Sequence, residues 1–157
     1  MRKDDVVASI VVGVDGSAGS AEALRWAITE AAPTGRDVVA VNVWSYAGGG
    51  ETAEAVRAAH RHALDELIDR VHTGAPEVPV QREIVEGDPV RMLLSVSSDA
   101  AMLVLGSHGY GRLSRALLGS VGAQCLRHAR CPVVIIPARR TAGHRPSEVD
   151  AHVGRVS

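Results

Sequence analysis

Lysine is almost missing from this chain, and its scarcity excludes two kinds of chemistry. The 157 residues include a single lysine, Lys3, at the extreme N-terminus. No lysine is therefore placed to form a Schiff base with a substrate inside a folded domain. The P-loop sequence G-x-x-x-x-G-K-[ST], whose lysine contacts phosphate, occurs nowhere in the chain. Schiff-base catalysis and the P-loop class of nucleotide hydrolases are thus excluded.

Cysteines and long apolar runs are also scarce. Cys125 and Cys131 are too few for a disulfide framework and lack metal-ligand spacing, so we interpret both as small buried hydrophobes. No apolar run approaches the ~18 residues that a membrane span requires. The N-terminal residues show no signal-peptide cleavage pattern. We therefore expect a reduced, cytoplasmic protein with no membrane partner.

Neither sign of charge dominates the sequence. Seventeen basic and 18 acidic residues give a formal net charge of −1. This balance argues against a broad polyanion-binding surface, so no nucleic-acid partner is expected, but it is compatible with one small anion site. Hydrophobic residues make up 46% and charged residues 22%, which is typical of a soluble globular protein. The length fits one domain, with or without a tail.

Patterns of buried strands and amphipathic helices alternate along the chain. β-Branched and extended runs predict strands over 6–14, 38–44, 78–86, 101–106 and 131–138. Apolar residues at helical spacing predict helices over 20–31, 51–71, 90–96 and 119–129. The third of these is expected to begin at Asp88 as N-cap, with Pro89 at its first position. This order predicts an α/β fold with an open, mostly parallel sheet. Residues 139–157 lose the periodicity and are predicted to form a disordered C-terminal tail after a domain of residues 1–138.

The long helix over 51–71 carries many charged and histidine side chains. Arg61–Asp65 and Glu66–Arg70 stand at i,i+4 spacing, which is typical of ion pairs on a solvated face. His60 and His62 are two residues apart and should face different sides of the helix, so we do not expect them to share a metal. We interpret this helix surface as solvated and predict no metal-binding residue.

Two segments directly follow strands, where ligands bind in sheets of this kind. Asp15 follows the first strand, and its carboxylate is able to accept hydrogen bonds from ribose hydroxyls. The structural alternative is an Asx-turn or an N-cap for the next helix, where Ser17 or Ser20 could act instead. Asp15 alone does not decide between the two.

The second segment, GSHGYGRLSRALLGS (106–120), suits a bound anion. Its glycines allow a ligand to approach the backbone, and a helix N-terminus at Gly119-Ser120 favours phosphate. Arg112 and Arg115 lie in this segment and no acidic residue does, so it is locally cationic. The structural alternative is that the glycines only form turns and that Ser120 is an ordinary N-cap.

The spacing Gly106-x2-Gly109-x9-Gly119-Ser120 resembles the G-x2-G-x9-G-[ST] nucleotide motif of the universal stress protein family. VVGVDGS, the GDP turn, LVLGSHG and CPVVIIP resemble further blocks of that family, in the same order, over about residues 5–138. The resemblance implies an open five-stranded parallel sheet in the order 3-2-1-4-5 with helices on both faces. It also implies ATP as the cofactor, because members with this motif typically bind ATP.

The resemblance further implies which residues contact the nucleotide. Asp15 would bind the ribose, Val43 would contact the adenine, and the glycines with the following helix start would hold the phosphates. Asn42 departs from the family pattern, because many members have histidine there. The cofactor-binding residues that we predict are Gly13, Val14, Asp15, Val43, Leu105, Gly106, Gly109, Arg112, Gly119, Ser120 and Val121.

We therefore predict an ATP-binding regulatory or stress-response protein without catalytic residues, because no general base, suitable lysine or metal–carboxylate cluster is identifiable. Mg²⁺ would accompany ATP only through its phosphates. The alternatives are a slow ATPase or autophosphorylating enzyme, and a module that binds AMP or cyclic AMP in the same pocket. A homodimer through the last strand, Val133 to Ile136, is also expected, because the resemblance implies that this apolar strand lies at a sheet edge, where unpaired backbone groups invite pairing.

Overall fold

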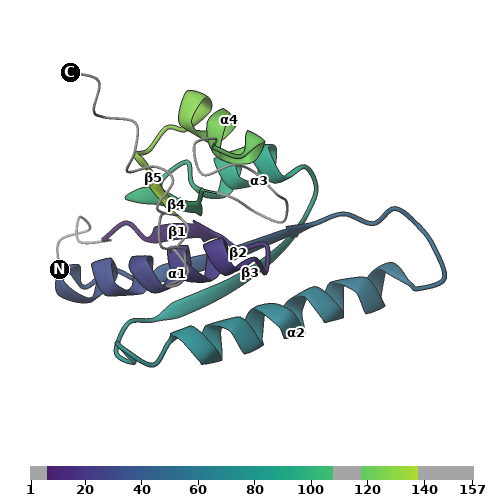
Figure 1. Ribbon diagram of the computed structural model, residues 1–157, viewed down its shortest axis with the longest axis horizontal. Helices are drawn as coiled ribbons and strands as arrows, with labels where there is room; N and C mark the ends of the chain where they lie inside the picture. The colour runs from purple at the N-terminus through teal and green to yellow at the C-terminus, as the bar shows by residue number, and fades with distance from the viewer. Residues whose placement is uncertain (1–6, 108–117, 138–157) are drawn as a thin grey trace, which may run out of the picture.

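The computed structural model describes residues 7–107 and 118–137. Strands and helices alternate along these residues, as the sequence predicts (Figure 1). The elements are β1 (Ile10–Gly13), α1 (Ala18–Ala31), the short 3-10 helix η1 (Ala32–Thr34), β2 (Val38–Trp44), α2 (Ala53–Val71), β3 (Val80–Glu86), α3 (Pro89–Val96), β4 (Met102–Gly106), α4 (Ser120–His128) and β5 (Val133–Ile136). The tail predicted over 139–157 lies outside the described residues.

All strands of the sheet run parallel, in the order β3-β2-β1-β4-β5. This is the order that the family resemblance implies, and it is confirmed. The chain moves outward from β1 to β3, then returns to the other side of β1 to form β4. The strand order therefore reverses between β1 and β4, where a crevice opens at the carboxyl ends of the strands.

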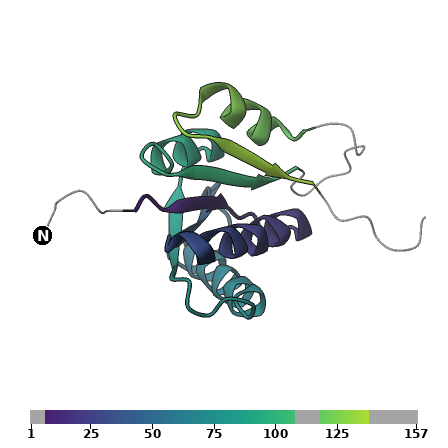
Figure 2. The same ribbon diagram turned by 90° about the vertical axis from the view of Figure 1, so that its left-hand side faces the viewer.

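Helices cover both faces of the sheet, α1 and α2 on one side and α3 and α4 on the other (Figure 2). Successive strand residues point to opposite faces. Ile10 and Val12 accordingly belong to the hydrophobic cluster under α1 and α2, whereas Val11 and Leu103 belong to the cluster under α3 and α4. Burial on both faces explains why the strands are continuous apolar runs in the sequence.

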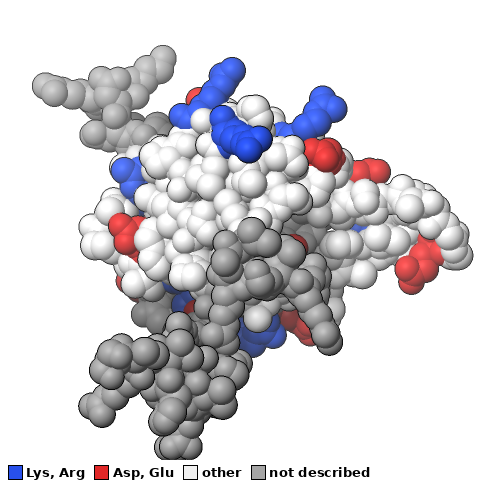
Figure 3. Space-filling model, turned by 45° about the horizontal axis from the view of Figure 1, so that its top comes forward, with Lys and Arg blue, Asp and Glu red and all other residues white. Residues whose placement is uncertain are grey.

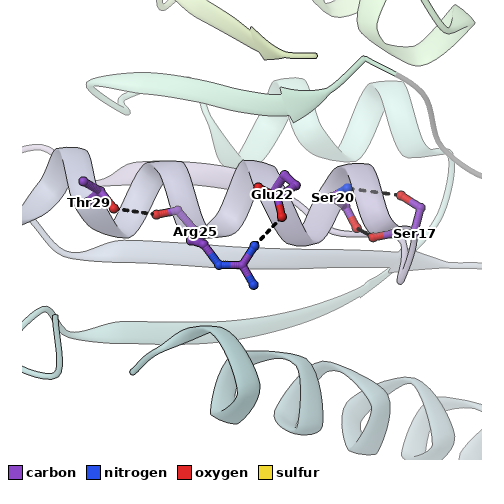
Figure 4. Close-up of polar contacts among 5 residues, drawn as sticks. All are labelled: Ser17, Ser20, Glu22, Arg25 and Thr29. Carbon is purple, nitrogen blue, oxygen red and sulfur yellow. Dashed lines mark hydrogen bonds and ion pairs between the residues drawn. The ribbon is translucent and has the colours of Figure 1, made fainter. Parts of the chain in front are cut away.

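Side-chain caps fix where three of the helices begin. Ser17 caps α1, Thr52 caps α2, and Asp88 caps α3 with Pro89 as its first residue, as predicted. In the first turn of α1, the Ser17 hydroxyl accepts from the Ser20 amide at 3.2 Å, and the Ser20 hydroxyl donates to the Ser17 carbonyl at 3.0 Å (Figure 4). This capping starts α1 at Ala18, slightly earlier than the apolar spacing alone indicates.

The ion pairs expected along α2 are wrong. Asp65 pairs with Arg82 of β3, and Arg82 also lies 3.9 Å from Asp69. Glu66 pairs with His62, at 3.2 Å, and not with Arg70. An exposed i,i+4 pair contributes only about 0.3–0.5 kcal/mol, so a cation presented by the neighbouring strand readily replaces it. The sequence pattern identifies a charged surface correctly but assigns its partners incorrectly.

Candidate nucleotide site

A cavity of about 410 Å³ opens at the carboxyl ends of β1, β2 and β4, where the strand order reverses. Its volume falls within the ~300–1,000 Å³ that small-molecule sites usually have. Four stretches of sequence form its walls: the end of β1 with the start of α1, the end of β2, the helix α3, and the end of β4 with the start of α4. The lining residues are Gly13, Val14, Asp15, Ser17, Ser20, Val41, Val43, Pro89, Leu93, Leu105, Gly106, Ser107, Gly119, Ser120, Val121 and Gly122.

The structure brings most of the predicted site residues together around this one cavity. Of the predicted set, Gly109 and Arg112 lie outside the described residues. The others all belong to the lining, namely Gly13, Val14, Asp15, Val43, Leu105, Gly106, Gly119, Ser120 and Val121. Segments that are far apart in the sequence meet here because β1 and β4 are neighbours in the sheet.

Asp15 forms an Asx-turn at the mouth of the cavity. Its Oδ1 accepts a hydrogen bond from the Ser17 amide at 2.9 Å, and Gly16 between them takes a positive φ of 84°. Ser17, and not Asp15, is the N-cap of α1. An ionised carboxylate offers about four acceptor positions, so one bond to Ser17 leaves it able to accept from the hydroxyls of a ligand. The structural and functional interpretations of Asp15 are therefore compatible.

The start of α4 offers backbone donors to the cavity. Gly119 is the N-cap and contributes no side-chain bond, while its own amide donates to the Ser107 carbonyl at 3.0 Å. Ser120 is the first helical residue and is exposed, so its interpretation as an ordinary N-cap is wrong. Within the described residues no side chain caps α4. Its first amides and its positive dipole end are therefore suited to an anion.

The glycines of the lining differ in what their local packing requires. A Cβ on Gly106 would lie 2.7 Å from the Gly19 carbonyl carbon, because the end of β4 packs directly against α1. A Cβ on Gly13 would lie 2.6 Å from Cδ2 of Leu105. A Cβ on Gly119 would meet only the Ser107 carbonyl oxygen, at an ordinary 3.5 Å. Among the three, Gly119 is the one whose missing side chain is not explained by packing within the described residues.

Several cavity residues are missing from the set predicted from the sequence. Pro89 and Leu93 of α3 form part of one wall, and Ser17, the N-cap of α1, forms part of another with Ser20. The prediction rests on residues that follow strands and on the start of α4, so positions on α1 and α3 were interpreted only as caps or core. The other lining residues that it lacks are Val41, Ser107 and Gly122. A usable signal was present for Leu93, which stands on the apolar stripe of the helix that follows the GDP turn.

Other reactive groups of the described residues lie away from the cavity. Cys125 is fully buried in α4, and its burial, with a smaller contribution from Cys131, raises the pKa of its thiol.

In the described part of the chain, no three His, Cys, Asp or Glu side chains gather as metal ligands. None of the helices in these residues has the length and apolarity needed to cross a bilayer. Charged side chains of both signs are scattered on the face shown in Figure 3, with much uncharged surface between them.

The order of strands, the cavity and its motif point to one family, and a comparison with family models decides it. The model described as "Universal stress protein family" matches residues 8–137. The chain belongs to the universal stress protein family. A universal stress protein of Mycobacterium tuberculosis is 37% identical over 145 residues, which cover 86% of this chain and 49% of the relative. The chain thus spans about half the length of the curated relatives it matches.

Solved structures of universal stress proteins have the same fold. One, determined in complex with cAMP, is 26% identical with a TM-score of 0.69, and the match covers 84% of this chain and 98% of that one. Another, from Archaeoglobus fulgidus in complex with dAMP, is 24% identical with a TM-score of 0.65, covering 83% and 98%. At that identity the second comparison supports the fold alone.

Proposed function

We propose that this universal stress protein binds an adenine nucleotide, with ATP as the main ligand, in the cavity at the ends of β1 and β4. The observation that carries the proposal is the convergence of three kinds of group around one cavity. An apolar wall, an exposed carboxylate and a helix start that no described side chain caps all line it. These groups match the base, the ribose and the phosphates of a nucleotide, respectively.

The base would lie against the apolar wall. Val41 and Val43 of β2, Leu93 of α3 and Leu105 of β4 all line the cavity, and three of them are buried to 95% or more. A purine ring buries a large apolar surface when it enters such a wall, which is the main favourable term for its binding. Backbone groups at the end of β2 would then supply the hydrogen bonds that orient the ring.

With the base against the apolar wall, the positions of the sugar and the phosphates would be determined as well. Asp15 at the cavity mouth would accept from the ribose hydroxyls, and the phosphates would lie at the start of α4 beside Gly119 and Ser120. Mg²⁺ would be held through the phosphates, because no cluster of metal-ligating side chains exists among the described residues. The protein would act as a regulatory binding module that responds to nucleotide.

A second ligand is favoured by one specific observation. The related universal stress protein with a TM-score of 0.69 was determined in complex with cAMP. Cyclic AMP or AMP would use the same base and ribose contacts, with one phosphate in place of three. A slow ATPase or an autophosphorylating protein remains the enzymatic alternative.

The deciding experiment identifies and titrates the ligand. One portion of the purified protein is denatured with acid, and any released nucleotide is identified by mass. A second portion, freed of bound nucleotide without denaturation, is titrated calorimetrically with Mg·ATP, AMP and cAMP. ATP binding at one site per chain is the expected result. Tighter binding of cAMP would assign the second ligand, and steady loss of ATP over minutes would indicate turnover. Failure of all three ligands at millimolar concentration would contradict the proposed function.

A variant at Gly119 tests the location of the site. Gly119→Val is expected to abolish ATP binding, because the branched side chain would occupy the place of the phosphates. The fold should persist, since Gly119 has φ −60° and ψ 156° and its Cβ would have only one ordinary contact. Gly74→Val is the matched control, because a Cβ there meets nothing within 4 Å. Unchanged ATP affinity in Gly119→Val would show that the site lies elsewhere.

A further inference from the structure

Asn42 of β2 connects the residues that follow β1 to the helix α2. Its side chain is buried, at 8% exposure, and its Nδ2 donates to the Val14 carbonyl at 2.8 Å. Its Oδ1 lies 2.8 Å from Nδ1 of His60 on α2. Val14 immediately precedes Asp15 in the chain. The Asn42 side chain thus links β2, α2 and the residues that follow β1, next to Asp15, the proposed ribose contact.

The direction of each hydrogen bond follows from the chemistry of the groups. The Val14 carbonyl only accepts, so it must face the NH₂ group of Asn42, which leaves Oδ1 as the acceptor toward His60. Nδ1 of His60 must therefore carry a hydrogen and donate. The ring of Trp44 lies beside the imidazole, with 6.1 Å between centroids and 34° between the ring planes. The two side chains form a directed contact from α2 to β1.

The segment that they hold lies between two hollows. Val14 and Asp15 line the nucleotide cavity on one side. On the other side they line a second hollow of about 250 Å³, whose walls also include Asn42, His60 and Leu64. The Val14 side chain is buried in the core, and its amide donates to the Val41 carbonyl at 2.8 Å. Asp15, by contrast, is exposed between the two hollows, and the bond from Asn42 holds the peptide group that leads into it.

His60 is well placed to anchor this contact. The buried residues of α2 are Leu64, Leu67, Ile68 and Val71, all in its second half. The first half of α2 extends beside the long loop that follows β2 (Figure 1), and most of its residues are exposed. His60 lies one turn before Leu64, so it contacts the sheet just where the packed part of the helix begins.

We propose that Asn42 and His60 are positioning residues for the nucleotide. The Val14 carbonyl and the Asp15 amide belong to one planar peptide group, so holding that oxygen fixes the orientation of the plane. The fixed plane directs the Asp15 carboxylate toward the ribose hydroxyls. His60 touches no ligand and acts through Asn42 and Asp15. The inference rests on the proposed function, because it concerns how the same cavity recognises the ribose.

The test uses a ligand that lacks the groups Asp15 would bind. His60→Leu is expected to weaken ATP binding about five- to tenfold, the usual effect of losing one such hydrogen bond. Binding of 2′,3′-dideoxy-ATP should change less than about twofold, because no ribose hydroxyl remains for Asp15 to contact. His62→Leu is the matched control, since His62 is exposed on the same helix and pairs with Glu66 and not with Asn42. Equal losses for both nucleotides would overturn the proposal.

Two further variants separate positioning from general stabilisation. In the Asp15→Ala background, adding His60→Leu should cause no additional loss of ATP affinity, because both changes remove the same contact. His60→Asn places an N–H donor at the position of Nδ1, within reach of Oδ1 of Asn42, and should restore most of the affinity. Multiplicative losses in the double variant, or no recovery with asparagine, would mean that His60 only stabilises the fold.

A measurement without ligand keeps the inference testable if the proposed function fails. If the wild-type protein binds none of the three nucleotides, the proposed function is wrong, and nitrogen-15 NMR then tests the contact itself. His60 should carry its hydrogen on Nδ1, and His60→Leu should shift the Asp15 amide, which shares a peptide group with the Val14 carbonyl. His62→Leu should leave that signal in place. An unshifted Asp15 amide in His60→Leu would overturn the positioning role independently of any nucleotide.

Discussion

Gly106 and Gly119 belong to one sequence motif, yet the structure gives them different reasons to be glycine. Gly106 lets the end of β4 contact the backbone of Gly19, so any side chain there would push β4 and α1 apart. Gly119 has room for a side chain in the described structure. Two residues that look equivalent in the motif thus contribute to the fold in one case and to an open cavity in the other.

Alanine at each position should separate these roles. Gly106→Ala is expected to lower the free energy of unfolding by about 1–3 kcal/mol, because the new methyl group meets backbone atoms that cannot move aside. Gly119→Ala should leave it within about 0.5 kcal/mol of wild type. Urea denaturation of the two variants provides the measurement. A Gly106→Ala protein as stable as wild type would contradict the close contact between β4 and α1.

The buried thiol of Cys125 predicts how stability depends on pH. Burial raises its pKa, so the folded chain keeps a proton that the unfolded chain releases above the ordinary thiol value of about 8.5. The unfolded state then binds fewer protons, and the free energy of unfolding falls as the pH rises above that value. Denaturation from neutral pH to about pH 10 should show a smaller decline in Cys125→Ala than in wild type. Identical declines would rule out this contribution.

At the residue scale, sequence predicts backbone-derived features better than side-chain partners. Asp15 was found because a residue that follows a strand must lie at the carboxyl end of the sheet, and Gly119 because it stands where a helix begins. The contact of Asn42 with His60 was not predictable, because it depends on how α2 is rotated and placed over β2. Arg82 was missed as the partner of Asp65 for the same reason. The spacing of residues within one helix or strand does not predict how that element is placed against another.

At the scale of elements, the boundaries reflect capping as much as hydrophobic pattern. β2 matches its apolar run from end to end, since both of its faces are buried. α3 begins where Asp88 and Pro89 predict, because the Asp88 carboxylate accepts from the Arg91 amide at 2.9 Å. β1 is shorter than the run over 6–14 that predicted it, because regular pairing with both neighbours begins at Ile10.

The cap of α3 should be worth measuring, because this helix forms one wall of the cavity. Asp88→Ala is expected to lower the free energy of unfolding by about 1 kcal/mol, the usual cost of losing an N-cap. Asp99→Ala is the control, because Asp99 is exposed and lies beyond the end of α3. Equal stability of the two variants, measured by chemical denaturation, would show that Pro89 alone determines where α3 begins.

At the scale of the whole molecule, the parallel sheet has two edge strands of different character. β3 carries charged and polar residues, whereas β5 is the apolar sequence VVII. The carbonyls of Pro132 and Ile136 accept from β4, so alternation turns the backbone groups of Val133 and Ile135 toward the open edge. This edge is the surface through which we propose that two copies of the chain pair.

Light scattering at micromolar concentration tests the proposed dimer. The wild-type protein should have twice the mass of the chain, and Val133→Pro should be monomeric, because proline removes an outward N–H group without disturbing the bonds to β4. Circular dichroism confirms whether the variant is folded. A wild-type monomer would contradict the dimer, and a folded dimeric Val133→Pro protein would contradict pairing through β5.

The composition of the cavity wall also determines how this protein can be detected chemically. Among the described residues, the lining contains neither lysine nor cysteine, and the sole lysine of the sequence, Lys3, stands outside the described residues. Reagents that tag nucleotide-binding proteins by acylating a lysine beside the phosphates would therefore leave the described lining unmarked. Photoreactive adenine analogues, which insert into C–H bonds, would find the side chains of Val43 and Leu105 instead. Proteome surveys built on lysine labelling would undercount proteins whose nucleotide sites are made of backbone and aliphatic groups.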